Sequence, residues 1–206
     1  GLPSGTGTLD AIAWASIDGV DDEALGYRFA TGDFDGDGAE DVLVTQILED
    51  LGGASDAGAV YLVADLATTL VGDGLTMAAV SAADVQGQWS EGYMGYVLAP
   101  VGDVDGDGSV EVLVDEPGGG ASGSGRIRLF SGAYMTDTNS NPDDWQILEW
   151  EPESPYASTG TRMAGGDFDG DGRADLVIGA RTYGMTSASA GSASGKVYIY
   201  LTGGSR

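Results

Sequence analysis

The chain has 206 residues, a formal net charge of −25 with eight basic residues, and neither histidine nor cysteine. Nucleic acids and anionic membranes bind through basic patches, so this charge argues against both as partners. The missing residue types exclude serine–histidine and cysteine–histidine catalytic pairs, histidine-based zinc sites and disulfides. No apolar run approaches the length of a membrane-spanning helix, so membrane insertion is not expected.

The first predicted element is a short strand near the N-terminus, residues 8–16, which includes the half-apolar segment from Leu9 to Trp14. No second strand follows it closely enough in the sequence to form a hairpin. It is therefore an orphan strand, which we expect to pair with a distant part of the chain.

An acidic loop then occurs three times, with carboxylates at loop positions 1, 3, 5 and 9 and glycines between them. Carboxylates packed this closely repel one another unless a cation lies between them. Flexible carboxylate oxygens of this kind suit calcium. The predicted side-chain ligands are Asp33, Asp35, Asp37 and Asp41 in the first loop, Asp103, Asp105, Asp107 and Glu111 in the second, and Asp167, Asp169, Asp171 and Asp175 in the third.

These loops are not EF-hands, which need a bidentate glutamate at loop position 12. That position is held by Val44, Val114 and Ile178. Apolar, β-branched runs follow each loop at once, which is typical of buried strands. Half-apolar runs that begin at a glycine precede the loops, at residues 26–32, 95–102 and 160–166. Each loop is therefore predicted to be the tip of a β-hairpin.

Further strands are predicted after each hairpin. Third strands are expected at residues 58–63, 125–130 and 195–200, and fourth strands at 76–80 and 145–150. The third unit has no fourth run. The middle unit is one residue longer before its loop, which predicts a bulge there.

This repeated unit resembles the FG-GAP repeat of integrin alpha subunits and of many secreted bacterial proteins. The matching features are the three Asp-x-Asp-Gly-Asp-Gly-x-x-Asp/Glu loops, the upstream glycine of each unit, and the Ile178-Gly179-Ala180 segment. The resemblance implies a β-propeller of four-stranded antiparallel blades, with calcium in the loops. It also implies that the backbone carbonyls of Ala39, Ser109 and Arg173 supply the ligand at loop position 7. Glu111 departs from the pattern, so the second site is expected to bind calcium most weakly.

The predicted fold is thus all-β, a single propeller domain over residues 1–206 with three blades. The blade units are expected at about residues 25–83, 94–151 and 159–206, with residues 8–16 completing the last blade. Phe34 and Phe168, at loop position 2, are expected to point into the blade core. Exposed aromatic side chains among Trp14, Trp89, Trp145 and Trp150 could bind sugar or protein.

The predicted function is a non-catalytic, calcium-binding module for extracellular adhesion or assembly, with a protein or a glycan as ligand. The alternative is an accessory domain of a secreted hydrolase or lyase. Calcium loops of this kind fill at the calcium levels outside cells, which favours a secreted or cell-surface protein. An open arc of three blades exposes apolar faces, so we expect a homo-oligomer: first a six-blade dimer, second a strand-exchanged filament.

Overall fold

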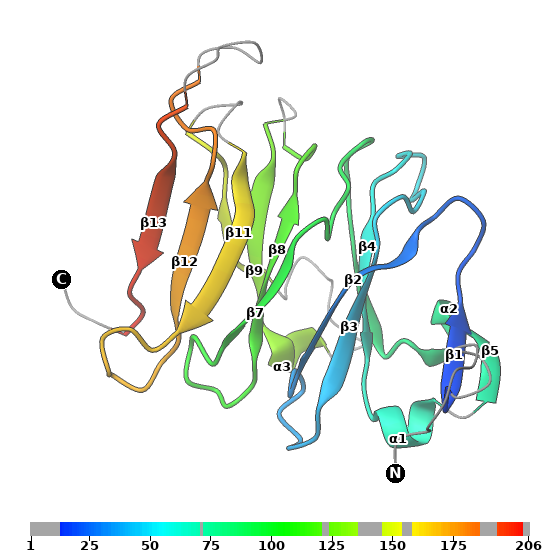
Figure 1. Cartoon of the computed structure of the whole chain (residues 1–206). Helices are drawn as coiled ribbons and strands as arrows, with labels where there is room; N and C mark the ends of the chain where they lie inside the picture. Colours follow the sequence, from blue (N-terminus) through cyan, green and yellow to red (C-terminus); the bar gives the residue numbers. More distant parts are fainter. Residues whose placement is uncertain are drawn as a thin grey trace, which may run out of the picture.

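The computed structural model describes residues 13–70, 72–120, 124–135, 146–153, 158–185 and 193–203. Three antiparallel β-sheets stand side by side, as Figure 1 shows, and a small two-stranded parallel sheet lies beyond the first of them. Each large sheet begins with the strand that precedes an acidic loop. The chain is therefore all-β and is built from propeller-like blades.

The strand order within each blade follows the chain. The first sheet is β2 (Leu25–Gly32), β3 (Asp41–Gln46), β4 (Ala59–Val63) and β6 (Ala83–Gln86). The second is β7 (Leu98–Gly102), β8 (Glu111–Glu116), β9 (Arg126–Phe130) and β10 (Gln146–Trp150). The third is β11 (Thr159–Gly166), β12 (Asp175–Ala180) and β13 (Lys196–Tyr200). The predicted loop hairpins and third strands are all present, and the bulge in the middle unit lies between Pro100 and Gly102.

The first strands of the three blades lie next to one another, because β2 and β11 both contact β7. The acidic loops connect β2 to β3, β7 to β8 and β11 to β12. They consequently lie at one end of the three sheets, at the bottom of Figure 1.

A small cap covers part of the outer face of the first sheet. It consists of β1 (Ala15–Asp18), α1 (Leu66–Thr69), β5 (Gly72–Thr76) and α2 (Met77–Val80), and β1 pairs in parallel with β5. Met77 and Val80 pack there with Val63, and Tyr61 lies against the same cluster. The cap thus covers the β4 part of the apolar face that the first blade turns away from the second, whereas Phe29 on β2 of the same face is 75% exposed.

One prediction about this region is wrong. The run at 76–80 forms helix α2 instead of a fourth strand, and that strand is β6. The predicted strand at 8–16, expected to complete the last blade, lies mostly outside the described residues. Its described end, Ala15 and Ser16, belongs to β1, which pairs with β5 beside the first blade and lies far from β13 (Figure 1).

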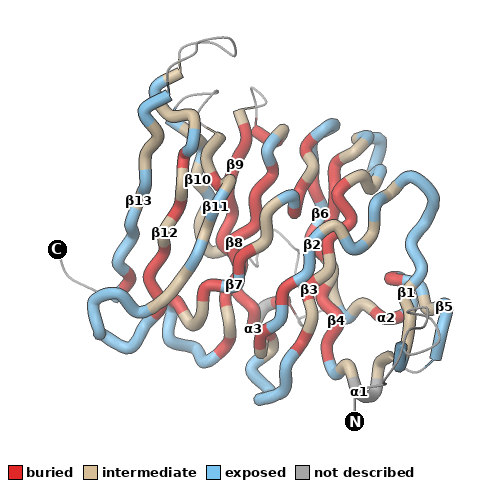
Figure 2. Tube along the Cα trace, in the orientation of Figure 1, coloured by how far each residue is buried: buried red, intermediate tan, exposed pale blue. Residues whose placement is uncertain are grey.

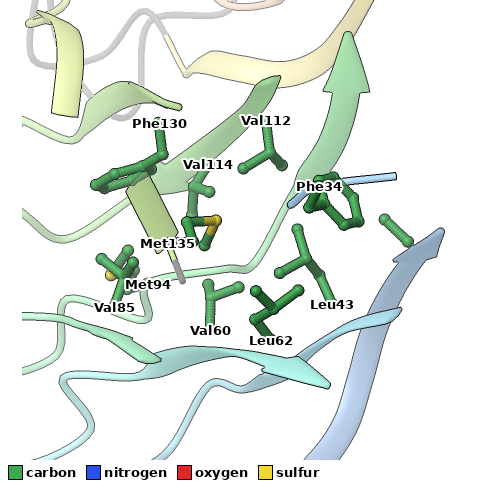
Figure 3. Packing of buried hydrophobic residues seen from close by; sticks show 11 residues of the cluster. Phe34, Leu43, Val60, Leu62, Val85, Met94, Val112, Val114, Phe130 and Met135 are labelled. Atoms are coloured by element: carbon green, nitrogen blue, oxygen red, sulfur yellow. The ribbon is translucent and has the colours of Figure 1, made fainter. Parts of the chain in front are cut away.

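The core between the first and second blades consists mainly of apolar side chains (Figure 3), and the buried Arg128 guanidinium contacts its Met94 sulfur. Leu43, Val60 and Leu62 on one sheet face Val112 and Val114 on the next. Phe34, at loop position 2, is fully buried in this cluster, and α3 (Gly132–Met135) contributes Met135. Burying such side chains contributes roughly 1.5–3 kcal/mol each.

A second core of the same kind joins the second and third blades. Leu113, Ile127 and Leu129 pack there against Leu176 and Ile178. Beyond it, the outer face of the third sheet has nothing on it among the described residues, and Figure 2 shows β13 largely exposed.

Phe168 was expected to point into the core, and this prediction is wrong. Its side chain is 52% exposed, whereas the equivalent Phe34 is 0% exposed. The loop places both rings on the same side of their blades, but only Phe34 has another blade to pack on.

One buried ion network holds the second blade together. The Glu116 carboxylate accepts hydrogen bonds from Arg126 Nε at 2.6 Å and from Arg128 Nη2 at 3.3 Å. Arg126 also pairs with Glu149 on β10 at 3.3 Å. Glu116 and both arginines are buried, so each charge depends on the others for its compensation.

We predict that Glu116→Gln lowers the free energy of unfolding by about 3–5 kcal/mol, because it removes the buried carboxylate that Arg126 and Arg128 share. Urea denaturation in saturating calcium measures this. The matched control is Glu153→Gln, which breaks the exposed pair with Lys196 and should change stability little. Equal effects of the two substitutions would contradict the prediction.

Candidate metal centres

The acidic loops fold around their own carboxylates in the same way three times. The side chain at position 1 accepts the backbone N–H of position 6, as in Gly38 to Asp33 at 3.0 Å. Positions 3 and 5 each accept the N–H two residues later, as in Asp37 to Asp35 at 3.1 Å and Ala39 to Asp37 at 2.7 Å. The second and third loops repeat these bonds. These local turns fix the loop shape, and the glycines at positions 4 and 6 take the positive φ that it needs.

The residue at position 9 is fixed by the sheet, because it is the first residue of the second strand of its hairpin. One of its oxygens accepts the N–H of position 2: Phe34 to Asp41 at 3.0 Å, Val104 to Glu111 at 2.6 Å and Phe168 to Asp175 at 2.7 Å. All three carboxylates are fully buried. In the second and third loops, the position-9 side chain lies within 4.8 Å of the carboxylates at positions 1 and 3.

Two of the second carboxylate oxygens at position 9, Asp41 Oδ1 and Glu111 Oε1, are buried without a partner among the described residues. At position 1 of the first loop, Asp33 Oδ1 is buried in the same way. A buried carboxylate oxygen without a donor is strongly unfavourable unless a cation satisfies it. The orphaned oxygens therefore fit a metal ion bound within the loops.

The structure brings three carboxylates of each loop within 4.8 Å of one another. The groups are Asp33, Asp35 and Asp37; Asp103, Asp105 and Glu111; and Asp167, Asp169 and Asp175. The side chains at positions 1 and 3 thus take part in every group. The predicted ligands Asp41, Asp107 and Asp171 fall outside the groups, and each accepts a backbone N–H bond. That the carbonyls of Ala39, Ser109 and Arg173 are ligands stays a prediction.

The electrostatics of the loops also favour a cation. Burial raises the pKa of the Glu111 carboxyl to about 7, with added repulsion from Asp105 and only partial relief from the Val104 N–H. Burial likewise raises the pKa of Asp35, Asp41 and Asp105. A divalent cation would reverse these effects, because it favours the ionised form of every carboxylate around it.

Neighbouring loops are joined through their backbones. The carbonyl of Asp33, at position 1 of the first loop, accepts the N–H of Val110, at position 8 of the second, at 3.0 Å. The carbonyl of Asp103 accepts the N–H of Ala174 in the same way at 2.8 Å. The first ligand of one loop is thus fixed to the residue before the last ligand of the next.

The third site contains one contact that the loop pattern does not predict. The Thr202 N–H donates to Asp175 Oδ1 at 2.8 Å, and its hydroxyl donates to the Ala174 carbonyl at 2.8 Å. Thr202 lies far from the loop in sequence, just after β13. The pairing of β13 with β12 brings it to the site, so no local sequence pattern predicts the contact.

Comparison with known proteins supports the same repeat. The FG-GAP repeat family model matches residues 25–63 and 159–200. Those residues include the first and third acidic loops. The middle unit lies outside the match, although its loop has the same hydrogen bonds and the same place in its sheet.

The chain is also similar to integrin alpha subunits. It is 33% identical to integrin alpha-PS2 of Drosophila melanogaster over 168 residues, which cover 77% of this chain and 11% of that protein. Integrin alpha-IIb of Homo sapiens is 31% identical, covering 76% of this chain and 14% of that protein. Integrin alpha-V of Gallus gallus is 28% identical, covering 78% of this chain and 20% of that protein. The chain therefore spans at most a fifth of these relatives.

Among solved structures, the rhamnogalacturonan lyase YesW matches 74% of this chain and 29% of its own, at 15% identity and a TM-score of 0.40. A likeness this distant assigns no activity to the chain.

We predict three unequal calcium sites, with the second the weakest, because Glu111 reaches its place through a longer side chain than Asp41 or Asp175. Calorimetric titration with calcium should resolve a weakest class, which consists of one of the three sites. Glu111→Gln should abolish that class, while the matched Asp175→Asn should abolish a tighter one. Three indistinguishable sites, or loss of a tight class in Glu111→Gln, would contradict this order.

Proposed function

Because the chain belongs to the FG-GAP repeat family, we propose that it is a calcium-stabilised propeller segment that works by binding other molecules and not by catalysis. The observation that carries the proposal is the set of buried, unpartnered carboxylate oxygens in the acidic loops. In this proposal calcium is structural. It fixes the tips of the hairpins from which the blades are built.

Calcium fits these sites better than other common metals. The ligand atoms are all oxygens, which excludes the soft and nitrogen-rich sites preferred by zinc and copper. Magnesium demands a strict octahedron and keeps several waters, whereas these loops offer many flexible oxygens around one point. Such loops fill at millimolar calcium, so we propose that the protein works outside the cell or at its surface. No helix of the described residues is long and apolar enough to cross a membrane.

The non-catalytic role rests on chemistry that the chain does not contain. It has no histidine and no cysteine, and its single lysine is engaged by Glu153 at 2.8 Å. Within the described residues, the carboxylates grouped closely enough to hold one cation are those of the acidic loops, where a bound cation would hold them ionised.

We predict that chelating calcium lowers the melting temperature by at least about 10 °C, because each filled site adds about 2–3 kcal/mol at 100-fold excess over its Kd. Differential scanning calorimetry with and without EGTA measures this. The triple variant Asp35→Asn, Asp105→Asn, Asp169→Asn should melt low in both conditions. A wild-type melting curve that does not respond to EGTA would refute the structural role.

We also propose that the protein assembles with itself through the outer face of the third blade, here called the open face. It consists of Phe168, Val177, Val197 and Ile199. Repeat-equivalent positions in the other blades are buried: Leu62 and Leu129 are 0% exposed, whereas Ile199 is 62% exposed. The side chains on this face thus have the same character as those that pack blade on blade elsewhere.

A second copy of the chain is the occupant we propose for the open face. Closing a six-blade ring, or extending a filament, would need the outer face of the first sheet. The cap already covers the β4 part of that face through Met77 and Val80. The pairing that leaves the cap in place is open face against open face, related by a two-fold axis.

We predict that Ile199→Lys converts a dimer to a folded monomer, because it places a charge in the centre of the open face. Light scattering at several protein concentrations, in calcium, measures the mass. The matched control is Val20→Lys, which changes an equally exposed valine near the cap and should remain a dimer. A wild-type monomer at all concentrations would overturn the assembly.

A further inference from the structure

The basic residues of this acidic chain are concentrated around one cavity. Of eight basic residues, four line a cavity of about 730 Å³: Arg28, Arg162, Arg181 and Lys196. We call it the arginine cavity. It lies toward the ends of β2, β11 and β12 that are remote from the acidic loops. In a chain with a net charge of −25, such a concentration of positive charge is not expected from composition.

The repeat itself places two of these arginines together. Arg28 and Arg162 are each the second residue after the glycine that begins the first strand of their units, Gly26 and Gly160. Their strands, β2 and β11, lie on either side of β7. The corresponding position of the middle unit is Val97, which also lines the cavity. Equivalent positions in the three units, on β2 and β11 and directly before β7, thus converge on one space.

The hydrogen bonds of Arg28 and Arg162 use only some of their guanidinium N–H donors. Arg28 Nη1 donates to the Tyr27 carbonyl at 3.0 Å, and Arg162 Nη1 donates to the Thr161 carbonyl at 2.6 Å. Within the described part of the chain, neither these two arginines nor Arg181 forms an ion pair. Each guanidinium carries five N–H donors in a planar fork, which suits the two oxygens of a carboxylate or sulfate.

Two nearby acids do not cancel this charge. Asp115 interacts with Arg28, but burial raises the pKa of its carboxyl to about 8, which disfavours its ionised form. Glu153 pairs with Lys196, whereas no carboxylate of the described residues forms an ion pair with the three arginines.

An aromatic pair stands beside these charges. The rings of Tyr27 and Tyr96 lie 5.1 Å apart between centroids, and Tyr96 lines the cavity. The Arg28 guanidinium lies 4.6 Å above the Tyr27 ring, which holds the side chain in place. The hydroxyls of Thr161 and Ser194 complete the lining. Tyrosine faces, hydroxyls and guanidinium forks form a combination that suits a sugar ring carrying an acidic group.

We propose that the arginine cavity binds an acidic saccharide, with Arg28 and Arg162 holding its carboxylate or sulfate and Tyr96 packing against the sugar ring. The volume matches that of ordinary ligand sites and accommodates a few sugar units. The surrounding negative charge repels densely charged polymers, so sparsely charged saccharides fit better than nucleic acids or poly-acidic peptides. This inference rests on the proposed binding role and names the ligand class for it.

The test uses the full chain in saturating calcium, titrated by calorimetry with a tetrasaccharide of alternating glucuronate and N-acetylglucosamine. A sulfated tetrasaccharide distinguishes sulfate from carboxylate as the bound group. The neutral N-acetylglucosamine tetramer and hexaglutamate are the comparison ligands. We expect an acidic tetrasaccharide to bind and both comparison ligands to bind at least about tenfold more weakly.

The double variant Arg28→Gln, Arg162→Gln should lose at least about tenfold in affinity, whereas Arg206→Gln, with one charge changed outside the described residues, should bind as the wild type does. Arg28→Lys, Arg162→Lys keeps the charge and should lose affinity because it removes the fork. Calcium titration and melting temperature are measured on every variant. Loss of calcium binding would count against the proposed function, not against the cavity.

Several results would overturn the proposal. They are no binding of either acidic tetrasaccharide, equal binding of the neutral tetramer, tighter binding of hexaglutamate, or unchanged affinity in a double glutamine variant that still binds calcium. Because Val197 belongs both to the open face and to the cavity lining, the titration is repeated on Ile199→Lys. Binding by that variant shows that the cavity does not depend on assembly, and its loss there would overturn a site built within one chain.

Discussion

Every blade in this chain depends on another layer packing against its faces. A β-sheet of three or four strands has two faces, and here both are apolar on the middle blade, where Val112 and Val114 pack on one side and Leu113 and Leu129 on the other. The first blade turns one face to the second blade and the other to the cap. The third blade is covered on one face only. Packing between blades, more than hydrogen bonding within them, therefore decides what is stable.

The acidic loops make that packing accurate. At each loop the carboxylate of position 9 binds the N–H of position 2, and this fixes where the residue at position 2 enters the core, as Phe34 and Val104 do. The backbone bond from position 8 of one loop to position 1 of the loop before it then aligns successive blades. A cation in the loop would stabilise both contacts at once. The metal centres and the apolar core thus form one coupled system.

The sequence predicted the parts of this fold that are local. Alternating carboxylates and glycines located all three hairpin tips, and the β-branched runs located the strands after them. It failed where distant packing decided the outcome. Residues 76–80 have apolar side chains that suit a strand, yet Met77 and Val80 cap the first blade as a helix. The destination of β1 and the exposure of Phe168 depend on which face is free. The arginine cavity was missed because its members lie in three different strands and no single segment carries the pattern.

The contact between neighbouring loops has a consequence for how such chains change over generations. It joins a main-chain N–H to a main-chain carbonyl, in Val110 to Asp33 and again in Ala174 to Asp103. No side chain takes part, so the junction makes no demand on which residues flank it. A duplicated or deleted gene segment that carries one whole unit would leave every remaining junction intact. The number of units can then vary without changes at the junctions between neighbouring loops, while the residues between the junctions diverge freely.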